Sequence, residues 1–411
     1  MARLKEYNGY YCESEYEYAF IGFLETEGWI YSSGNNISRV TKRDVLIADD
    51  FKKFIVDTNP DLTEDEVTQI FDNVRLVGSE SDFATLHKVY GWMVNGIQFT
   101  PQDGIARMIP LIDFKKDSNK NIFRVVNQFT VEYTNNGQKE NRRPDVLLFV
   151  NGMPLCIIEL KNPADANATI YDAWEQINIR YWRDIPHLLH YCTLACISDG
   201  VKTRLGTVRT PYEHFYAWRR VNDGDAVSTL PFEETETMIK GVYAPERFLE
   251  IFRDYIYFQD SIYDSDEVEI VCRYPQFFAA RLLKQSIINS VVQKSGKGGT
   301  YFGATGCGKT YTMAFLARQL ALRCTDILEI GSPTIILIVD RDELQKQGAK
   351  LFTKSKEFLN LGEVAVVKNR AQLRQELGAR QSGGFYICTI QKFCDREDDK
   401  IGLINDRQNI I

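Results

Sequence analysis

Two acidic residues and a lysine occur at a spacing that suits a divalent cation beside a phosphate. Arg143-Pro144-Asp145 opens one apolar run, and Ile158-Glu159-Leu160-Lys161 closes the next. Mg²⁺ takes one or two carboxylates together with water and phosphate oxygens, and it lowers the pKa of a bound water. This pattern favours Asp145 and Glu159 as metal ligands, with Lys161 positioning a nucleophile or neutralising developing charge. The alternative is a surface ion pair at the end of a hairpin.

The connection between the two runs decides whether the acids can cooperate. A tight turn of only Asn151-Gly152 would place Asp145 opposite Ile158. Glu159 would then lie on the other face of the sheet. A longer connection with an odd number of residues would place Asp145 opposite Glu159. Because Pro154 cannot donate a ladder hydrogen bond, we predict the longer, odd loop.

A second constellation has the spacing of a phosphate-binding loop. Residues 303–310, Gly-Ala-Thr-Gly-Cys-Gly-Lys-Thr, fit G-x-x-x-x-G-K-[ST] in full. In such a loop the glycines allow a positive φ, and the backbone N–H groups cradle phosphates. Tyr301-Phe302 predicts the strand before the loop, and a helix is expected after it. We expect nucleotide contacts from Gly303, Thr305, Gly306, Gly308, Lys309 and Thr310, with Lys309 at the β- and γ-phosphates and Thr310 on Mg²⁺.

Composition limits the class of protein. The chain has 411 residues, of which 44% are hydrophobic and 26% charged, so it is too apolar for a disordered chain. A net charge of -7 excludes a histone-like protein coated in basic charge. No apolar run approaches the roughly 18 residues of a membrane span, and no signal-peptide core follows the first residues. The nine cysteines include no C-x-x-C pair, which indicates reduced thiols and a soluble, cytoplasmic protein.

The flanking patterns predict an α/β fold. Apolar spacing indicates helices and β-branched runs indicate strands, which together predict a mixed sheet between helices. The helices are expected at residues 13–27 and 164–182, and the strands at 123–133, 145–150, 155–159 and 191–198. A later alternation of helix 276–294, helix 309–323, strand 334–339 and helix 341–355 predicts a parallel sheet. We expect a first domain over 1–240, a linker and bridging helix over 241–265, and a second domain over 266–411.

The first constellation resembles the PD-(D/E)xK nucleases, and more narrowly the endonuclease (R, restriction) subunit of type I restriction–modification enzymes. The matching residues run from Asn141 through Asp145 and Asn151-Gly152-Met153-Pro154 to Asn162. The resemblance implies a PD-(D/E)xK α/β sandwich with Asp145, Glu159 and Lys161 at its active site. It also implies an acid on the first helix, here Glu17, and a Gln-x-x-x-Tyr motif. Gln176 fits that motif, but Arg180 occupies the tyrosine position and Tyr181 follows it, so only Gln176 is assigned.

The second constellation resembles superfamily 2 helicase motors, which implies a partial RecA-like P-loop domain. Besides the P-loop, the likeness rests on Arg273-Tyr274-Pro275-Gln276 and on the segments 338–344 and 389–393. It implies that Gln276 contacts adenine and that Arg341 and Gln391 touch the DNA backbone. No D-E-x-H follows residue 393, so we expect a lobe truncated before that motif, with almost no ATP hydrolysis.

Together the two likenesses imply a type I site-specific deoxyribonuclease with Mg²⁺ and ATP as cofactors. Such a subunit cleaves unmethylated foreign double-stranded DNA after ATP-driven translocation, and its partners are the methylation (M) and specificity (S) subunits. Arg142 and Arg143 beside Asp145 are expected to meet DNA phosphates, with a solvated charged turn as the alternative. Two other functions remain open: a catalytically silent truncated subunit that docks to the methylation and specificity core, and a helicase or ATPase with a structural nuclease-like domain.

Overall fold

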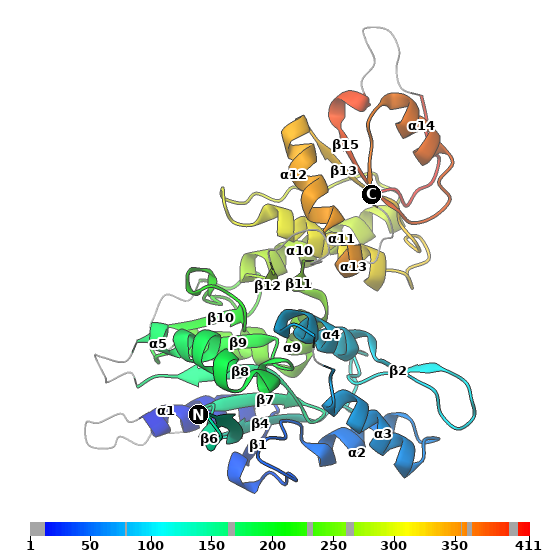
Figure 1. Ribbon diagram of the computed structural model, residues 1–411. Helices are drawn as coiled ribbons and strands as arrows, with labels where there is room; N and C mark the ends of the chain where they lie inside the picture. Colours follow the sequence, from blue (N-terminus) through cyan, green and yellow to red (C-terminus); the bar gives the residue numbers. More distant parts are fainter. Residues whose placement is uncertain are drawn as a thin grey trace. The chain divides into compact units, whose positions relative to one another are not determined.

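The chain forms two compact units in the computed structural model, Met1–Arg253 and Asp254–Ile411 (Figure 1). The structure describes residues 13–78, 80–162, 169–227, 233–259, 267–354, 356–359, 364–393 and 402–411. The division falls inside the segment that the sequence assigns to a linker. The bridging helix expected within this segment is α9 (Pro245–Asp254), and the chain then continues as strand β11 (Ile256–Phe258).

A mixed sheet forms the centre of the first unit, as predicted. Its strand order is β1-β4-β7-β8-β9-β10, in which β1–β4 and β8–β9 are parallel and the other neighbours antiparallel. Every residue of β7, β8 and β9 is buried, which accounts for their nearly continuous apolar sequences. The strands are β1 (Ile30–Ser33), β4 (Phe123–Asn127), β7 (Val146–Val150), β8 (Met153–Leu160), β9 (Leu194–Ser198) and β10 (Thr203–Thr207).

Helices surround this sheet, and two of them carry predicted site residues. Helix α1 contacts β1 and β8, and α5 contacts β8 and β9. The expected helix over 164–182 begins outside the described residues and is seen as α5, a π-helical turn labelled η2, and α6. The helical segments are α1 (Glu13–Thr26), α2 (Ala48–Thr58), α3 (Glu64–Arg75), α4 (Asp82–Asn95), α5 (Ile170–Glu175), η2 (Gln176–Tyr181), α6 (Trp182–Asp184), α7 (Pro186–Leu189), α8 (Glu233–Met238) and the π-helical η4 (Ile239–Tyr243).

The β7–β8 connection differs from the prediction. Val150 pairs with Met153, so the turn is Asn151-Gly152 alone, and the longer loop is wrong. Both turn residues have positive φ, 51° and 76°, as the tight turns of twisted hairpins require. Further along the hairpin the pairing shifts by one residue, between Leu148 and Phe149, and this shift changes which residues of β8 lie opposite those of β7.

This register shift is a β-bulge that leaves Leu155 as the extra residue on β8. Phe149 pairs with Pro154 and Leu148 with Cys156, which accommodates the proline where ladder hydrogen bonding is interrupted. Beyond the bulge Val146 pairs with Ile158, so the next position along places Asp145 across from Glu159. The geometry that the longer loop was invoked to produce therefore arises from a tight turn and a bulge.

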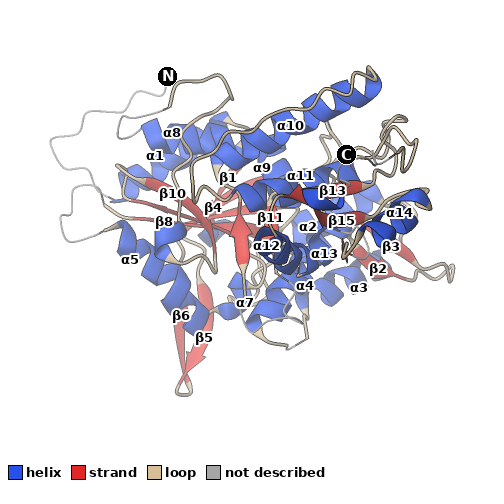
Figure 2. Ribbon diagram, turned by 90° about the horizontal axis from the view of Figure 1, so that it is seen from above, coloured by secondary structure: helices blue, strands red, loops and turns tan. Residues whose placement is uncertain are grey.

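Among the described residues of the first unit, two antiparallel ribbons lie outside the main sheet. The first is β2 (Ile97–Phe99) with β3 (Arg107–Ile109), and the second is β5 (Val131–Asn135) with β6 (Gln138–Arg142). The β5–β6 ribbon extends away from the main sheet (Figure 2). The single strand expected over 123–133 is thus divided, because Gln128 adopts a φ of 52° and ends β4.

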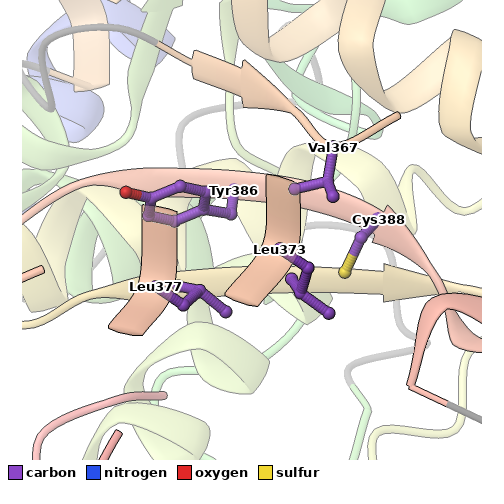
Figure 3. Packing of buried hydrophobic residues seen from close by; sticks show 5 residues of the cluster. All are labelled: Val367, Leu373, Leu377, Tyr386 and Cys388. Carbon is purple, nitrogen blue, oxygen red and sulfur yellow. The ribbon is translucent and has the colours of Figure 1, made fainter. Parts of the chain in front are cut away.

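The second unit contains the predicted parallel sheet, in the order β13-β15-β14. Leu373 and Leu377 from one helix pack with Tyr386 and Cys388 from the central strand, and Val367 completes this buried cluster (Figure 3). The elements are β12 (Glu269–Val271), α10 (Tyr274–Val292), α11 (Lys309–Arg323), β13 (Ile335–Val339), α12 (Asp342–Thr353), α13 (Lys356–Leu359), β14 (Val364–Val366), α14 (Arg370–Gly378) and β15 (Phe385–Thr389).

The strand expected before the P-loop is not formed, so this part of the prediction is wrong. Tyr301 and Phe302 have irregular backbone, and the Phe302 side chain is 96% exposed. An extended segment becomes a strand only where a neighbour exchanges hydrogen bonds with it. Within the described part of the chain, no strand pairs with these residues. In that same part, no helix has the combined length and apolar character needed to cross a membrane.

Candidate active site

Asp145 and Glu159 lie at the same end of the neighbouring strands β7 and β8. Asp145 is 7% exposed and Glu159 is fully buried. The backbone N–H of Leu160 donates to Asp145 Oδ2 at 2.8 Å, which fixes the orientation of that carboxyl group. The register thus brings together the two acids that the sequence analysis selected as metal ligands.

A chain of three hydrogen bonds joins the predicted lysine to Glu159. Lys161 Nζ donates to Gln176 Oε1 at 3.0 Å, and Gln176 Nε2 donates to the Tyr181 hydroxyl at 2.7 Å. The Tyr181 hydroxyl in turn donates to Glu159 Oε1 at 2.8 Å. Each of these side chains is therefore oriented by the next, and Gln176 links the lysine to the acid through Tyr181.

Tyr181 is not assigned from the sequence, because it stands one position beyond the expected motif. In an α-helix, a residue five positions on is turned by about 140° around the axis. Residues 176–181 instead form a π-helical turn, in which hydrogen bonds join i and i+5. That turn absorbs the extra residue and places Tyr181 beside Gln176. The tyrosine one residue late was the only signal available in the sequence.

Burial dominates the electrostatics of these acids. It raises the pKa of Asp145, and the Leu160 N–H and Lys161 oppose that rise. The pKa of Glu159 is raised well above its usual value, first by burial and then by the neighbouring Asp145. Burial also raises the pKa of the Tyr181 phenol. Tyr181 therefore keeps its proton and donates a hydrogen bond to Glu159. Such raised pKa values of buried acids are typical of functional sites that bind a cation or transfer a proton.

The donor set fits a divalent cation. Glu159 Oε2 is buried and has no hydrogen-bond partner among the described residues, while Oε1 is held by Tyr181. A buried carboxylate oxygen that is left unpaired carries a desolvation penalty, which a bound cation would relieve. Two neighbouring carboxylates match the preference of Mg²⁺, which completes its ligand shell with water and phosphate oxygens. Asp145 and Glu159 are therefore the residues that would hold it.

We predict that the contribution of Asp145 and Glu159 to thermal stability, without divalent cation, falls as pH rises from about 5 to 8. The raised pKa values mean that the folded state retains protons that the unfolded state has released, so stability is greatest below the unfolded values near pH 4. Each retained proton contributes a slope of about 1.4 kcal/mol per pH unit. Because Mn²⁺ competes with these protons, its stabilising effect should grow over the same range.

Thermal unfolding followed by circular dichroism at pH 5 and pH 8, with EDTA or Mn²⁺, measures this linkage. The matched variant Glu159→Gln keeps the shape of the side chain but cannot titrate. It should show a smaller fall in stability with pH and a smaller response to Mn²⁺. The same pH dependence in both proteins would contradict the proposed linkage.

Glu17 lies on α1 and is 5% exposed, but it is held by a different part of the fold. Its Oε1 accepts from Asn127 Nδ2 at 2.6 Å, and its Oε2 accepts from Gln128 Nε2 at 2.7 Å. Across the residues that the structure describes, no group of three or more His, Cys, Asp or Glu side chains is close enough to share a metal. Glu17 is thus connected to the Asp145 region through Gln128, not through a shared three-acid cluster.

The two arginines expected at DNA phosphates have different environments. Arg142 forms an ion pair with Asp184 through Nε at 2.7 Å and Nη2 at 2.6 Å, and its guanidinium lies 5.0 Å from the Tyr133 ring centroid. Its charge therefore already has a partner within the protein. Arg143 is exposed. Of the two, Arg143 is the more available to an external phosphate.

In the second unit, two glycines of the phosphate-binding loop adopt the positive φ that the sequence pattern predicts. Gly306 and Gly308 have φ of 78° and 79°, and Gly308 caps α11. Lys309 Nζ donates to the carbonyl oxygens of Gly303 and Ala304 at 2.9 Å each, and thus lies over its own loop. Thr305 is exposed, and Thr310 occupies the first turn of α11.

The remaining motor residues lie at two places. Gln276 is 4% exposed and donates to the Cys307 and Gly308 carbonyl oxygens at 3.3 and 3.1 Å, so its side chain holds the P-loop. Gln391 donates to the Asp340 carbonyl at 2.7 Å, and Arg341 Nε lies 3.5 Å from the Asp340 carboxylate. Arg341 and Gln391 therefore both lie beside Asp340, where the parallel strands β13 and β15 end.

Comparisons with known proteins find a matching family model for a large part of each unit. Residues 10–214 match the model described as type I restriction enzyme R protein N terminus, and residues 275–411 match the SWI2/SNF2 ATPase model. The chain is 30% identical, over 96% of its length, to the putative type I restriction enzyme MjaIXP endonuclease subunit of Methanocaldococcus jannaschii. It is 28% identical, over 97% of its length, to the HindI endonuclease subunit of Haemophilus influenzae. The chain spans 39% and 38% of the lengths of these two relatives.

Proposed function

Because the chain belongs to the family of type I restriction enzyme R proteins, we propose that its first unit is a divalent-cation-dependent DNA endonuclease with a PD-(D/E)xK fold. Its substrate is double-stranded DNA, and the reaction is hydrolysis of a phosphodiester bond. Asp145 and Glu159 hold the cation, Lys161 is a catalytic residue, and Gln176, Tyr181 and Glu17 support them.

The observation that carries this proposal is the chain of hydrogen bonds from Lys161 to Glu159. This chain consists of three hydrogen bonds of 2.7 to 3.0 Å and ends on a carboxylate whose other oxygen is buried and unpaired within the described residues. A surface ion pair at a hairpin end would be solvated and would not require this arrangement. Preorganised groups of this kind are what stabilise charge that develops during a reaction.

The roles of the protein groups follow from their contacts. A bound Mg²⁺ would supply a Lewis acid for the phosphate and a bound water of lowered pKa. Tyr181 donates to Glu159 Oε1 and leaves Oε2 for the ion, while the Leu160 N–H orients Asp145. Gln176 accepts from Lys161 and so holds its ammonium group at the end of the sheet. There the ammonium orients the water or neutralises charge on the phosphate as the P–O bond breaks.

The second unit is proposed to bind ATP through the P-loop, with Lys309 at the phosphates, Thr310 on Mg²⁺ and Gln276 bracing the loop. Support comes from the left-handed glycines of the loop and from the likeness to the SWI2/SNF2 ATPase model. Arg341 and Gln391 are proposed DNA contacts of a RecA-like lobe. In a complete complex, we propose that this motor translocates DNA and that methylation and specificity subunits are the partners.

We expect the chain to nick supercoiled plasmid in Mg²⁺ or Mn²⁺ but not in EDTA. Conversion of supercoiled to open-circular plasmid on an agarose gel measures the activity, and calorimetric titration with Mn²⁺ measures cation binding separately. Cation binding without cleavage would indicate that activity needs the partner subunits. The absence of both in a folded chain would contradict the nuclease proposal and favour a silent subunit.

A further inference from the structure

The two residues that follow the last apolar position of β4 contact both the first helix and the start of β7. Asn127 pairs with Val146 in the ladder, and Gln128 lies next to it, across from Asp145. The Gln128 backbone N–H donates to the Asp145 carbonyl oxygen at 3.0 Å. A single residue therefore continues the pairing with the strand that begins after Asp145 while its side chain points elsewhere.

Gln128 is held in an unusual conformation. Its φ is 52°, in the left-handed region that non-glycine residues with flexible side chains seldom adopt. Gly34 packs directly against this bend: a Cβ on Gly34 would lie 2.7 Å from Asn127 O, Gln128 O and Phe129 Cα. Because the backbone of another segment closes over the bend, the conformation is fixed by the surrounding structure. Strain that the fold maintains in this way commonly occurs beside functional groups.

The bend directs the two amide side chains onto one carboxylate. Asn127 Nδ2 holds Glu17 Oε1 at 2.6 Å, and Gln128 Nε2 holds Glu17 Oε2 at 2.7 Å. The Tyr31 hydroxyl donates to Asn127 Oδ1 at 3.1 Å and so orients that amide. Each Glu17 oxygen thus receives a donor, and the plane of the carboxylate is defined by the same dipeptide whose backbone contacts Asp145.

From these contacts we propose that Gln128 is a positioning residue, which fixes Glu17 on α1 and Asp145 just before β7 relative to each other and thereby sets the affinity of the site for a divalent cation. The inference rests on the proposed nuclease function only in assigning the cation to Asp145 and Glu159. Glu17 acts by adding negative charge at this end of the sheet in a fixed orientation. Without the Gln128 amide, the Glu17 carboxylate loses the hydrogen bond that Gln128 donates to Oε2, and its orientation is less well defined.

The test is Mn²⁺ titration of the chain in the absence of nucleotide, with Gln128→Gly, Glu17→Gln and the double variant. Glycine accepts the left-handed φ, so Gln128→Gly removes the amide without forcing the backbone. A matched control is Asn136→Gly, because Asn136 is exposed at the tip of the β5–β6 ribbon and has a φ of 48°. It corrects for the entropic cost of glycine at a left-handed position.

We expect Gln128→Gly to weaken Mn²⁺ binding about tenfold, because the negative charge of Glu17 is then no longer held in a fixed orientation at this end of the sheet. If Gln128 acts through Glu17, the double variant should bind no more weakly than Glu17→Gln alone, since effects in one network are not additive. The melting temperature in EDTA should be only slightly below that of Asn136→Gly, because the Glu17 carboxylate keeps its hydrogen bond from Asn127. Mn²⁺ affinity unchanged by Gln128→Gly, or additive losses in the double variant, would overturn the inference.

The same titration separates this inference from the proposed activity. If the parent chain binds Mn²⁺ and does not cleave DNA, cleavage needs the partner subunits, and the variants still decide the role of Gln128. If the parent chain does not bind Mn²⁺, the inference is overturned as well. A loss of affinity in Gln128→Gly that is matched by a large fall in melting temperature in EDTA would show a purely structural role and also overturn it.

Discussion

Replacing Lys161 by alanine is expected to reduce DNA cleavage about a hundred- to a thousandfold while Mn²⁺ binding persists. The lysine contacts Gln176 and not the carboxyl oxygens that would hold the cation, so its loss should remove catalysis and spare the ligands. Because Lys161 lowers the pKa of both Asp145 and Glu159, the comparison is best made near pH 8, where the raised acids are more fully ionised. Plasmid nicking measures the activity, and calorimetric titration measures the cation affinity.

Two further variants separate a loss of catalysis from a loss of cation binding in Lys161→Ala. Asp145→Asn should lose cation binding and cleavage together, because it removes a ligand. Lys139→Ala is the matched control, since Lys139 is also a lysine near Asp145 in sequence, but its side chain is 85% exposed on the β5–β6 ribbon. It should cleave DNA like the parent chain. If Lys161→Ala retains cleavage, the lysine is part of a structural ion pair and the proposed catalytic role is wrong.

Replacing Gly152 by alanine is expected to destabilise the first unit by about 3–5 kcal/mol, a fall in melting temperature of about 10 °C. Gly152 has a φ of 76°, and a Cβ there would lie 2.2 Å from the Ile47 carbonyl oxygen and 2.9 Å from Phe51 N. Both are backbone atoms at the start of α2, and the Gly152 carbonyl accepts from Ile47 N at 2.8 Å. Neither side of this contact can retreat without breaking the turn or the helix start.

Gly137→Ala provides the control for Gly152→Ala. Gly137 has a similar φ of 81° in the turn of the β5–β6 ribbon, but nothing lies within 4 Å of an added Cβ. It should lose only the roughly 1 kcal/mol that a left-handed alanine costs. Thermal unfolding followed by circular dichroism compares the two variants. Equal losses of stability would show that backbone conformation alone, and not the contact with α2, explains the glycine at 152.

The sequence by itself determined which chemical groups are present and much of the local structure. Alternating and β-branched runs predicted the mixed sheet, and the spacing of Gly303 to Thr310 predicted a loop followed by a helix. The resemblance to type I restriction endonuclease subunits is supported by the family model and by relatives that match nearly the whole chain. These properties were readable because they depend on residue type and short-range spacing. The catalytic assignments of the individual residues stay predictions.

Only the tertiary structure decided how those groups meet. Sequence parity argued for a long loop, whereas a tight turn at Asn151-Gly152 and a bulge at Leu155 bring Asp145 opposite Glu159. Motif spacing left Tyr181 unassigned, whereas a π-helical turn brings it onto Glu159. Each depends on one residue inserted into a regular ladder or helix, and packing against the rest of the fold decides where such a residue is accommodated. Short-range sequence patterns do not depend on that packing, so the residues of the site could be predicted from the sequence and their geometry could not.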